Sequence, residues 1–273
     1  MKSCHTQVDS TTNIALDISK NVIPSVEGLD ITLDDGVLIL TLNRPRKLNA
    51  LTLEMYTYIR DTLDKAGSDP RVNVCVLTGV GDYYCSGNDM LNFTKTFELH
   101  NFRTFVEAFI RFPKPLVCAV NGPAVGIAVT LLGLCDIVYS SDTATFHTPF
   151  MTLGLCPEGC SSYTFPKIMG YARANEMLLA GREITAREAF DRGLVTDIFP
   201  SSDFKVRVAE KIKILASMPQ QSLLFGKALT KNQELETLMD VNEKECERAS
   251  ERLSSKECTQ AVRKFLSKKN QCS

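Results

Sequence analysis

Two short segments of the chain are almost continuously apolar, and they limit the fold more than any other feature. They are Val72–Thr78 and Leu116–Val120. A strand with one face in water alternates apolar and polar residues, whereas a strand buried on both faces does not, and such strands are typical of parallel sheets covered by helices. Each segment is followed by a glycine-containing loop and an expected helix, the order of a β–α unit. The sequence therefore predicts an α/β fold.

The remaining elements are predicted from turn residues and hydrophobic spacing. Residues 31–42 indicate a hairpin that turns at Asp35–Gly36, and short strands are expected at 137–139 and 145–147. Helices are expected over 52–66, from 89 onward, and over 100–111, 127–134, 172–180, 185–192, 206–217, 221–247 and 254–268. We therefore expect a poorly ordered segment at 1–25, an α/β core at 26–200 and a helical C-terminal extension at 201–273.

Composition excludes several classes of function. The formal net charge of −1 gives no indication of a nucleic-acid or anionic-membrane partner. The 10 cysteines include no C-x-x-C pair and no zinc-ligand set, which favours a reduced intracellular protein without structural metal. No apolar run is long enough to span a bilayer. No secretory or mitochondrial signal is readable at the N-terminus, and the C-terminus does not end in Ser-Lys-Leu.

Glu158 is the strongest candidate for chemistry. It is the only carboxylate residue between Asp142 and Glu176, and its neighbours are apolar or small. Such surroundings raise the pKa of a carboxyl group, because desolvation disfavours the charged form. A base of this kind can take and return a proton near neutral pH. The alternative is a solvated glutamate in an ordinary Pro-Glu-Gly turn.

Two loops share one design and predict an oxyanion site. A buried strand leads into Ser86–Asp89, and the next leads into Gly126–Val129. Backbone N–H groups at the start of a helix lack partners, so two such ends together can bind one developing negative oxygen. Taken singly, each segment is better explained as an ordinary turn between a strand and a helix. Together with one nearby base they favour enolate chemistry beside a thioester carbonyl.

Four motifs in order resemble those of the crotonase (enoyl-CoA hydratase/isomerase) superfamily. They are Asn43–Ala50, Ser86–Asp89, Asn121–Gly126 and Cys135–Asp136, and the resemblance runs over about 29–268. It implies a crotonase (ClpP-like) spiral of β-β-α units with a helical C-terminal extension. Residues 145–150 and 157–167 are similar to the peroxisomal-type Δ3,Δ2-enoyl-CoA isomerase branch, without its acyl-CoA-binding domain.

The resemblance also implies roles for individual residues. The two glutamates of hydratases fall on Thr130 and Phe150, so two-acid hydration is not expected. Glu158 takes the place of the isomerase base, and the oxyanion donors map to the backbone N–H groups of Ser86 and Ile127. The CoA moiety is expected near Lys47, Asn49, Ala50, Ser86, Gly87, Asn88, Asp89 and Met90, with Arg46 and Lys47 as candidates for its phosphates. Asp136 is expected to anchor a loop.

The implied function is movement of the double bond of 3-enoyl-CoA to trans-2-enoyl-CoA in the β-oxidation of unsaturated fatty acids. CoA is then part of the substrate, and no cofactor or metal is expected. Two other readings stay open, a non-catalytic module that binds CoA or a protein and a hydratase or hydrolase of the same fold. The family also implies a homotrimer or a dimer of trimers, in the peroxisome or the mitochondrion, with the cytosol left open. The segment 91–105 is expected to shape the acyl pocket.

Overall fold

The computed structural model describes residues 25–90, 92 and 99–271. The segment predicted to be disordered, 1–25, lies almost wholly outside them, as does much of the expected acyl-pocket segment 91–105. In the described part of the chain, no helix is both long and apolar enough to cross a bilayer.

A six-stranded sheet forms the centre of the molecule, in the order β1-β2-β3-β4-β6-β9. The predicted hairpin is confirmed as antiparallel β1 (Leu29–Asp34) and β2 (Val37–Leu42). The other neighbours pair in parallel: β3 (Val74–Gly79), β4 (Leu116–Val120), β6 (Ile137–Ser141) and β9 (Asp197–Phe199). A smaller sheet joins β5 (Ala124–Val125), β7 (Thr145–His147) and β8 (Ile184–Thr185).

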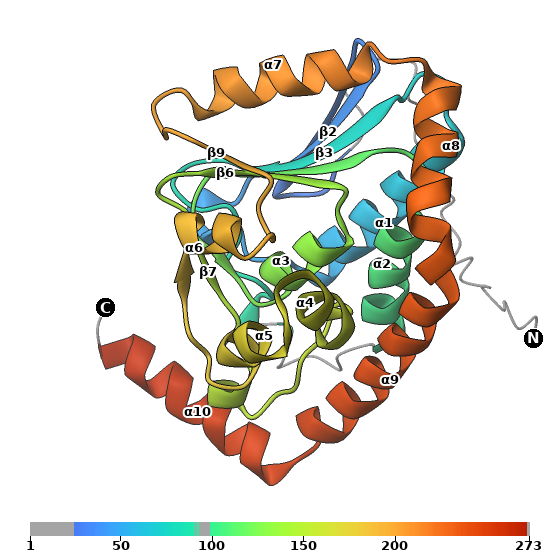
Figure 1. The fold of residues 1–273 in the computed structure, drawn as a ribbon. Coiled ribbons are helices and arrows are strands. Elements are labelled where there is room, and N and C mark those ends of the chain that lie inside the picture. Colours follow the sequence, from blue (N-terminus) through green and yellow to red (C-terminus); the bar gives the residue numbers. More distant parts are fainter. Residues whose placement is uncertain (1–24, 91, 93–98, 272–273) are drawn as a thin grey trace, which may run out of the picture.

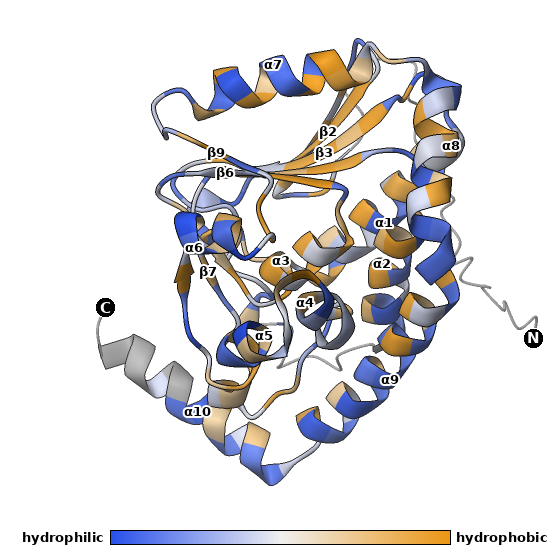
Figure 2. Ribbon diagram, viewed as in Figure 1, coloured by the Kyte–Doolittle hydropathy of each residue, from blue (hydrophilic) through white to orange (hydrophobic). Residues whose placement is uncertain are grey.

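Both faces of the central sheet are covered, as the continuous apolar strands predicted. Successive side chains of a strand point to opposite faces. On β3, Cys75 and Leu77 join the main core, which includes residues of α1 (Leu53–Ser68) and α2 (Leu99–Arg111). Val74 and Val76 join a second core against α7 (Phe204–Ala216). Figure 1 shows α7 on the opposite side of the sheet from α1 and α2, and Figure 2 shows the hydrophobic strands between them.

The strand–loop–helix unit after β4 is confirmed, although its helix is short. It consists of α3 (Ile127–Thr130) and a 3-10 turn, η3 (Leu131–Leu134). Further 3-10 turns are η1 (Pro45–Lys47) and η4 (Met151–Leu153). The expected helix from Asp89 is a 3-10 turn at residues 90 and 92.

The C-terminal helices differ in detail from the prediction. The expected helix at 221–247 is broken into α8 (Gln220–Lys231), the 3-10 turn η5 (Asn232–Glu234) and α9 (Leu235–Leu253), followed by α10 (Lys256–Gln271). The expected helices at 172–180 and 185–192 are α5 (Tyr171–Leu178) and α6 (Ala186–Asp191). Helix α4 (Ser161–Met169) was not predicted, and it contains Pro166. Because α9 packs on α2 and α4, the C-terminal extension contributes to the core of the fold.

Asp136 anchors the chain just before β6, as expected. Its Oδ2 accepts a hydrogen bond from the Leu116 amide at 2.7 Å, and its carboxylate pairs with Lys227 at 2.7 Å and Lys231 at 3.2 Å. The Lys227 side chain is only 8% exposed. Burial lowers the pKa of Lys227 to about 8, and the Asp136 charge opposes that shift. One carboxylate thus connects β4, the start of β6 and helix α8.

We predict that Asp136→Ala lowers the free energy of unfolding by about 3 kcal/mol or more, because it leaves a buried ammonium group without its counter-ion. Asp240→Ala is the matched control. Its pair with Lys244 is exposed, at 58% and 68% of the two side chains, and should contribute less than about 1 kcal/mol. Urea denaturation measures both values. Equal losses in the two variants would contradict the assigned role of Asp136.

Candidate active site

The loops that follow β3 and β4 lie against each other. Cys85 and Ala124 form an isolated parallel bridge, and the Val125 amide donates to the Cys85 carbonyl at 2.9 Å. Gly87 has a φ of +86°, and a Cβ there would lie 2.7 Å from the Val125 carbonyl oxygen. Only glycine permits this approach, because it has no side chain and adopts positive φ readily. The twin loops predicted from the sequence therefore lie side by side.

The amide donors of the first loop differ from the prediction. The Ser86 N–H, predicted as an oxyanion donor, donates to the Leu48 carbonyl at 2.9 Å. The Asp89 amide is occupied in the same way by the Leu51 carbonyl at 2.9 Å, and the Gly87 amide contacts the Cys85 sulfur at 3.4 Å. Within the described part of the chain, no acceptor is found for the amide of Asn88. The assignment to Ser86 is thus wrong for this structure, and Asn88 carries the available donor.

The Asn88 side chain is held from two directions. Its Oδ1 accepts hydrogen bonds from Asn92 Nδ2 at 2.5 Å and from the Tyr56 hydroxyl at 3.3 Å. Asn92 also donates to the Leu51 carbonyl at 2.9 Å. Both partners are buried. These contacts fix the peptide that carries the free amide.

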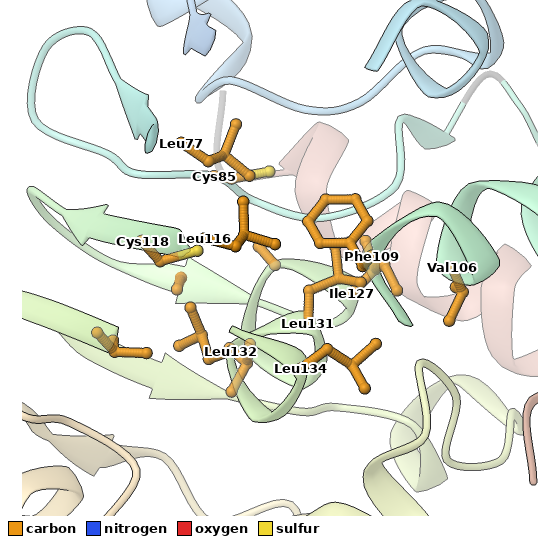
Figure 3. Packing of buried hydrophobic residues seen from close by; sticks show 14 of the residues in the cluster. Leu77, Cys85, Val106, Phe109, Leu116, Cys118, Ile127, Leu131, Leu132 and Leu134 are labelled. Atoms are coloured by element: carbon orange, nitrogen blue, oxygen red, sulfur yellow. The ribbon is translucent and has the colours of Figure 1, made fainter. Parts of the chain in front are cut away.

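The second predicted donor, the amide of Ile127, is free to donate, and its role at an oxyanion remains a prediction. It opens helix α3, and no acceptor for it occurs among the residues described. The Ile127 side chain is 1% exposed and belongs to the main core. Figure 3 shows it beside Phe109 of α2 and Leu131 of η3. Core packing thus holds the start of α3 in place.

Glu158 is placed beside this second loop by the glycine that follows it. A Cβ on Gly159 would lie 2.5 Å from Thr130 Oγ1 and 3.1 Å from Ile127 Cδ1. The backbone after Glu158 therefore packs directly on helix α3. The carbonyl of Glu158 also accepts a hydrogen bond from the Ser161 hydroxyl at 2.8 Å. Tertiary packing therefore brings the segment that carries the predicted base against the helix that Ile127 opens.

The environment of Glu158 supports its assignment as a base. Part of its surface remains exposed, yet its carboxyl group is densely surrounded by protein. Burial, and secondarily the carboxylate of Glu245, raise its pKa to about 8. No hydrogen-bond donor to this carboxylate occurs among the described residues. The prediction of a raised pKa is confirmed, and the carboxylate is free to accept a proton.

The two segments predicted to contact CoA run side by side. Their backbones are joined by the Ser86–Leu48 bond and by a bond of 2.8 Å from the Leu51 amide to the Gly87 carbonyl. Arg46 and Lys47 are exposed, as phosphate contacts would need to be. Ser86, Asn88 and Met90 are partly exposed, whereas Gly87 is buried. Contact with CoA itself remains a prediction for these residues.

Three of the predicted CoA residues are turned toward the protein. Asn49 is 0% exposed, and its side-chain amide donates to the carbonyls of Val80 and Tyr83. Asp89 pairs with Arg44 at 2.9 Å, and Arg44 also donates to the carbonyl of Ala50, which is 8% exposed. Their side chains shape the loops, so a contact of Asn49 or Ala50 with ligand would involve the backbone. Arg44 was missed, although it lies within the motif at 43–50.

Comparison with known proteins shows the family to which this chain belongs. Residues 32–272 match the family model for enoyl-CoA hydratase/isomerase. The chain belongs to this family. Over 252 residues it is 50% identical to enoyl-CoA delta isomerase 2 of Rattus norvegicus, an alignment that covers 89% of the chain and 64% of the rat protein. The chain thus spans less than two thirds of that relative's length.

Two further relatives support the family assignment. The chain is 46% identical over 248 residues to peroxisomal enoyl-CoA delta isomerase 3 of Mus musculus, with 88% of the chain and 78% of the mouse protein covered. A crystal structure of an enoyl-CoA hydratase/isomerase from Pseudoalteromonas atlantica superposes with a TM-score of 0.85 at 35% identity, covering 89% of this chain and 98% of that one. The predicted crotonase-type fold is confirmed.

This member of the enoyl-CoA hydratase/isomerase family has no carboxylate at the two positions where the resemblance places the hydratase glutamates. Thr130 is 0% exposed and donates to the Ile127 carbonyl at 3.3 Å, and Phe150 is 3% exposed within the core. Sequence reasoning missed one buried carboxylate, Glu245 of α9, whose charge acts on Glu158. Helical spacing could have indicated it, because Glu245 lies seven residues after Leu238 and therefore on the same, buried face of α9.

We predict that Gly159→Ala lowers the free energy of unfolding by about 1–3 kcal/mol more than Gly181→Ala does. Both glycines have nearly the same φ, +64° and +65°, but nothing lies within 4 Å of a Cβ on Gly181. The control thus carries the left-handed backbone cost alone, about 1–2 kcal/mol, whereas Gly159→Ala adds overpacking.

A double-mutant cycle checks the origin of the extra cost, because Thr130→Ala removes the hydroxyl that the new Cβ would meet. Thr130→Ala combined with Gly159→Ala should recover part of the loss in urea denaturation. Strictly additive effects would contradict the packing of Gly159 on Thr130.

Proposed function

We propose that this protein is a Δ3,Δ2-enoyl-CoA isomerase, acting in the β-oxidation of unsaturated fatty acids. The observation that carries the proposal is Glu158, a carboxylate with a pKa raised to about 8 and no hydrogen-bond donor among the described residues, in a segment whose next residue, Gly159, packs on helix α3. The names of the rat and mouse relatives support the same activity.

The reaction needs one base and an oxyanion site. The thioester oxygen of a 3-enoyl-CoA accepts hydrogen bonds from the amides of Asn88 and Ile127. Glu158 removes a proton from C2, and the electron pair moves into a dienolate whose negative charge rests on that oxygen. The protonated carboxyl group then returns the proton to C4, which leaves the 2,3 double bond of trans-2-enoyl-CoA. Each amide donor should stabilise the transition state by on the order of 3 kcal/mol.

The reaction class follows from which carboxylates face the site. Adding water across a double bond by the two-acid route requires a second acid or base, and Thr130 and Phe150 supply neither. Moving a proton between two carbons requires only one group that both accepts and donates it. A pKa near neutrality suits both steps, since neither proton state is strongly preferred.

The proposal also specifies the ligand and the setting. CoA is part of the substrate, and one carboxylate with two amides completes the chemistry without a metal or separate cofactor. Lys47 and Arg46 are proposed to approach the phosphates of CoA.

A trimer or a pair of trimers is proposed from the family. It is supported by exposed apolar side chains on α7 and α8, among them Val206, Ile214, Phe225 and Leu229. Peroxisome or mitochondrion is the proposed location, and the mouse relative is named as peroxisomal.

We predict that Glu158→Gln folds normally but loses isomerisation, because the amide keeps the shape of the side chain and cannot take the proton. The assay incubates purified protein with 3-hexenoyl-CoA and follows the absorbance of the conjugated product. Turnover should fall by at least about a hundredfold, with CoA binding and a cooperative melting transition retained. Wild-type turnover in this variant would exclude Glu158 as the base. A wild-type protein that binds CoA without turnover would instead favour a binding module.

The pH dependence should follow the raised pKa of Glu158. Because the base must be deprotonated, kcat/KM should rise with pH to a midpoint at about 8.

The stability of the folded protein should change with pH in the opposite direction. The pKa in the fold lies above the ordinary value of 4.5, so the stabilisation is fully present below 4.5 and is lost as the pH rises through about 8. Glu158→Gln should therefore melt higher relative to wild type at pH 9 than at pH 5. The same difference at both pH values would contradict this assignment.

A further inference from the structure

Glu245 is a buried carboxylate from the C-terminal helix α9 that reaches into the segment carrying Glu158. It is 7% exposed. Its Oε2 accepts a hydrogen bond from the Cys160 amide at 2.6 Å, and its Oε1 accepts one from the Ser162 amide at 2.9 Å. Both oxygens are thus directed at backbone two and four residues beyond the proposed base. Hydrogen bonds from amides to an ionised acceptor are about twice as strong as neutral ones.

The turn that Glu245 binds has an unusual backbone. Gly159 and Cys160 both have left-handed φ values, +64° and +62°. For a residue other than glycine this conformation is uncommon and must be stabilised by its surroundings. Cys160 also precedes helix α4 and provides no side-chain cap. Glu245 therefore acts as the missing cap from another helix, since it accepts hydrogen bonds from amides that the start of α4 leaves unpaired.

A second contact joins the same turn to α9. The Cys160 thiol donates to the Leu238 carbonyl at 3.4 Å, and the Ser161 amide donates back to the Glu158 carbonyl at 3.2 Å. The backbone from Glu158 to Ser162 is thus tied to itself and to α9, while Gly159 packs on α3. The Glu158 side chain has no hydrogen bond of its own in the described residues. Its orientation therefore depends on this backbone.

We propose that Glu245 is a positioning residue: its carboxylate clamps the turn Gly159–Cys160, so that Glu158 is aimed at the proton it transfers. This inference rests on the proposed function of Glu158 and adds helix α9 to the site. A general base needs such support because a displacement of about 1 Å can reduce turnover by about a hundredfold. The role is distinct from that of a second acid or base, since both Glu245 oxygens are occupied by backbone amides.

The charge of Glu245 has a separate effect. The titratable groups that interact electrostatically with Glu158 come from α1, α9 and its own segment: the charge of Glu245 acts on Glu158, and the charge of Glu158 acts on Tyr56, Cys246 and Cys156. Burial raises the pKa of the Tyr56 hydroxyl well above its ordinary value, and raises the pKa of the thiols to about 11 for Cys156 and about 12 for Cys246. These three groups are neutral at physiological pH. Glu245 is therefore the neighbour whose negative charge disfavours ionisation of Glu158.

The test compares Glu245→Gln, Glu245→Asp and the control Glu247→Gln, which makes the same change at an exposed position of the same helix. The glutamine removes the charge, and its NH2 group cannot accept a hydrogen bond, so one of the two backbone amides loses its acceptor. The aspartate keeps the charge but is one methylene too short to reach both amides. Three quantities are measured on each full-length variant: kcat and KM on 3-hexenoyl-CoA, the pH midpoint of kcat/KM, and hydrogen exchange of the amides in 160–162.

We expect kcat to fall about 10- to 100-fold in both Glu245 variants with KM little changed. The pH midpoint should move to lower pH in Glu245→Gln and stay near the wild-type value in Glu245→Asp. Exchange of the 160 and 162 amides should become faster in both, and Glu247→Gln should match wild type. If Glu245→Gln does not fold, Glu245→Asp decides by the same measurements.

A purely structural Glu245 would lower the melting temperature and leave kcat and the pH midpoint unchanged at temperatures well below it, and that result would overturn the proposal. The exchange measurement does not depend on substrate. The wild-type protein could be inactive on 3-hexenoyl-CoA and still show slow hydrogen exchange of the amides at 160–162, with faster exchange in Glu245→Gln. That result would contradict the proposed function and support the clamp. Full activity in Glu245→Gln with unchanged exchange would contradict the clamp alone.

Discussion

Contact between the loops after β3 and β4 is the constraint on which the rest of the site depends. Parallel pairing brings the carboxyl ends of both strands to one edge, and the Cys85–Ala124 bridge holds the two loops together. Gly87 permits the approach because a side chain there would collide with the Val125 carbonyl. Without this contact, the free amides of Asn88 and Ile127 would be hydrogen-bond donors in two unconnected turns. With it, the two loops that carry these amides are adjacent, as the proposed binding of a single oxygen requires.

Burial raises the pKa of two neighbouring carboxyl groups, Glu158 and Glu245, but their hydrogen bonds differ, and that difference supports different roles. Glu245 is satisfied by the amides of Cys160 and Ser162. Glu158 receives no such hydrogen bond within the described residues, and burial raises its pKa to about 8. A carboxylate held by amides stabilises backbone, whereas one left without donors is available for proton transfer. The same chemical group thus serves as a structural anchor on α9 and as a proposed base beside α3.

Much of the fold could be predicted because its signals are local. The apolar runs of β3 and β4, the Asp35–Gly36 hairpin and the helix at 53–68 all follow from short-range patterns. The elements that were missed have weak patterns. Strands β5, β8 and β9 are two or three residues long, too short for alternation to be recognised. Helix α4 contains Pro166 and lacks a side-chain cap, since its cap comes from Glu245 in a distant part of the chain.

The sequence by itself determined the fold class, the position of the lone carboxylate and the absence of the hydratase glutamates at 130 and 150, because these depend only on residue type and order. Only the tertiary structure decided which amides are free. Ser86 and Asn88 are two positions apart in one loop, yet the Ser86 amide is taken by the Leu48 carbonyl and the Asn88 amide is not. It also decided that Glu245, far from Glu158 in the chain, binds the turn that carries it. Hydrogen-bond partners of this kind are set by how distant segments pack, and residue spacing does not encode them.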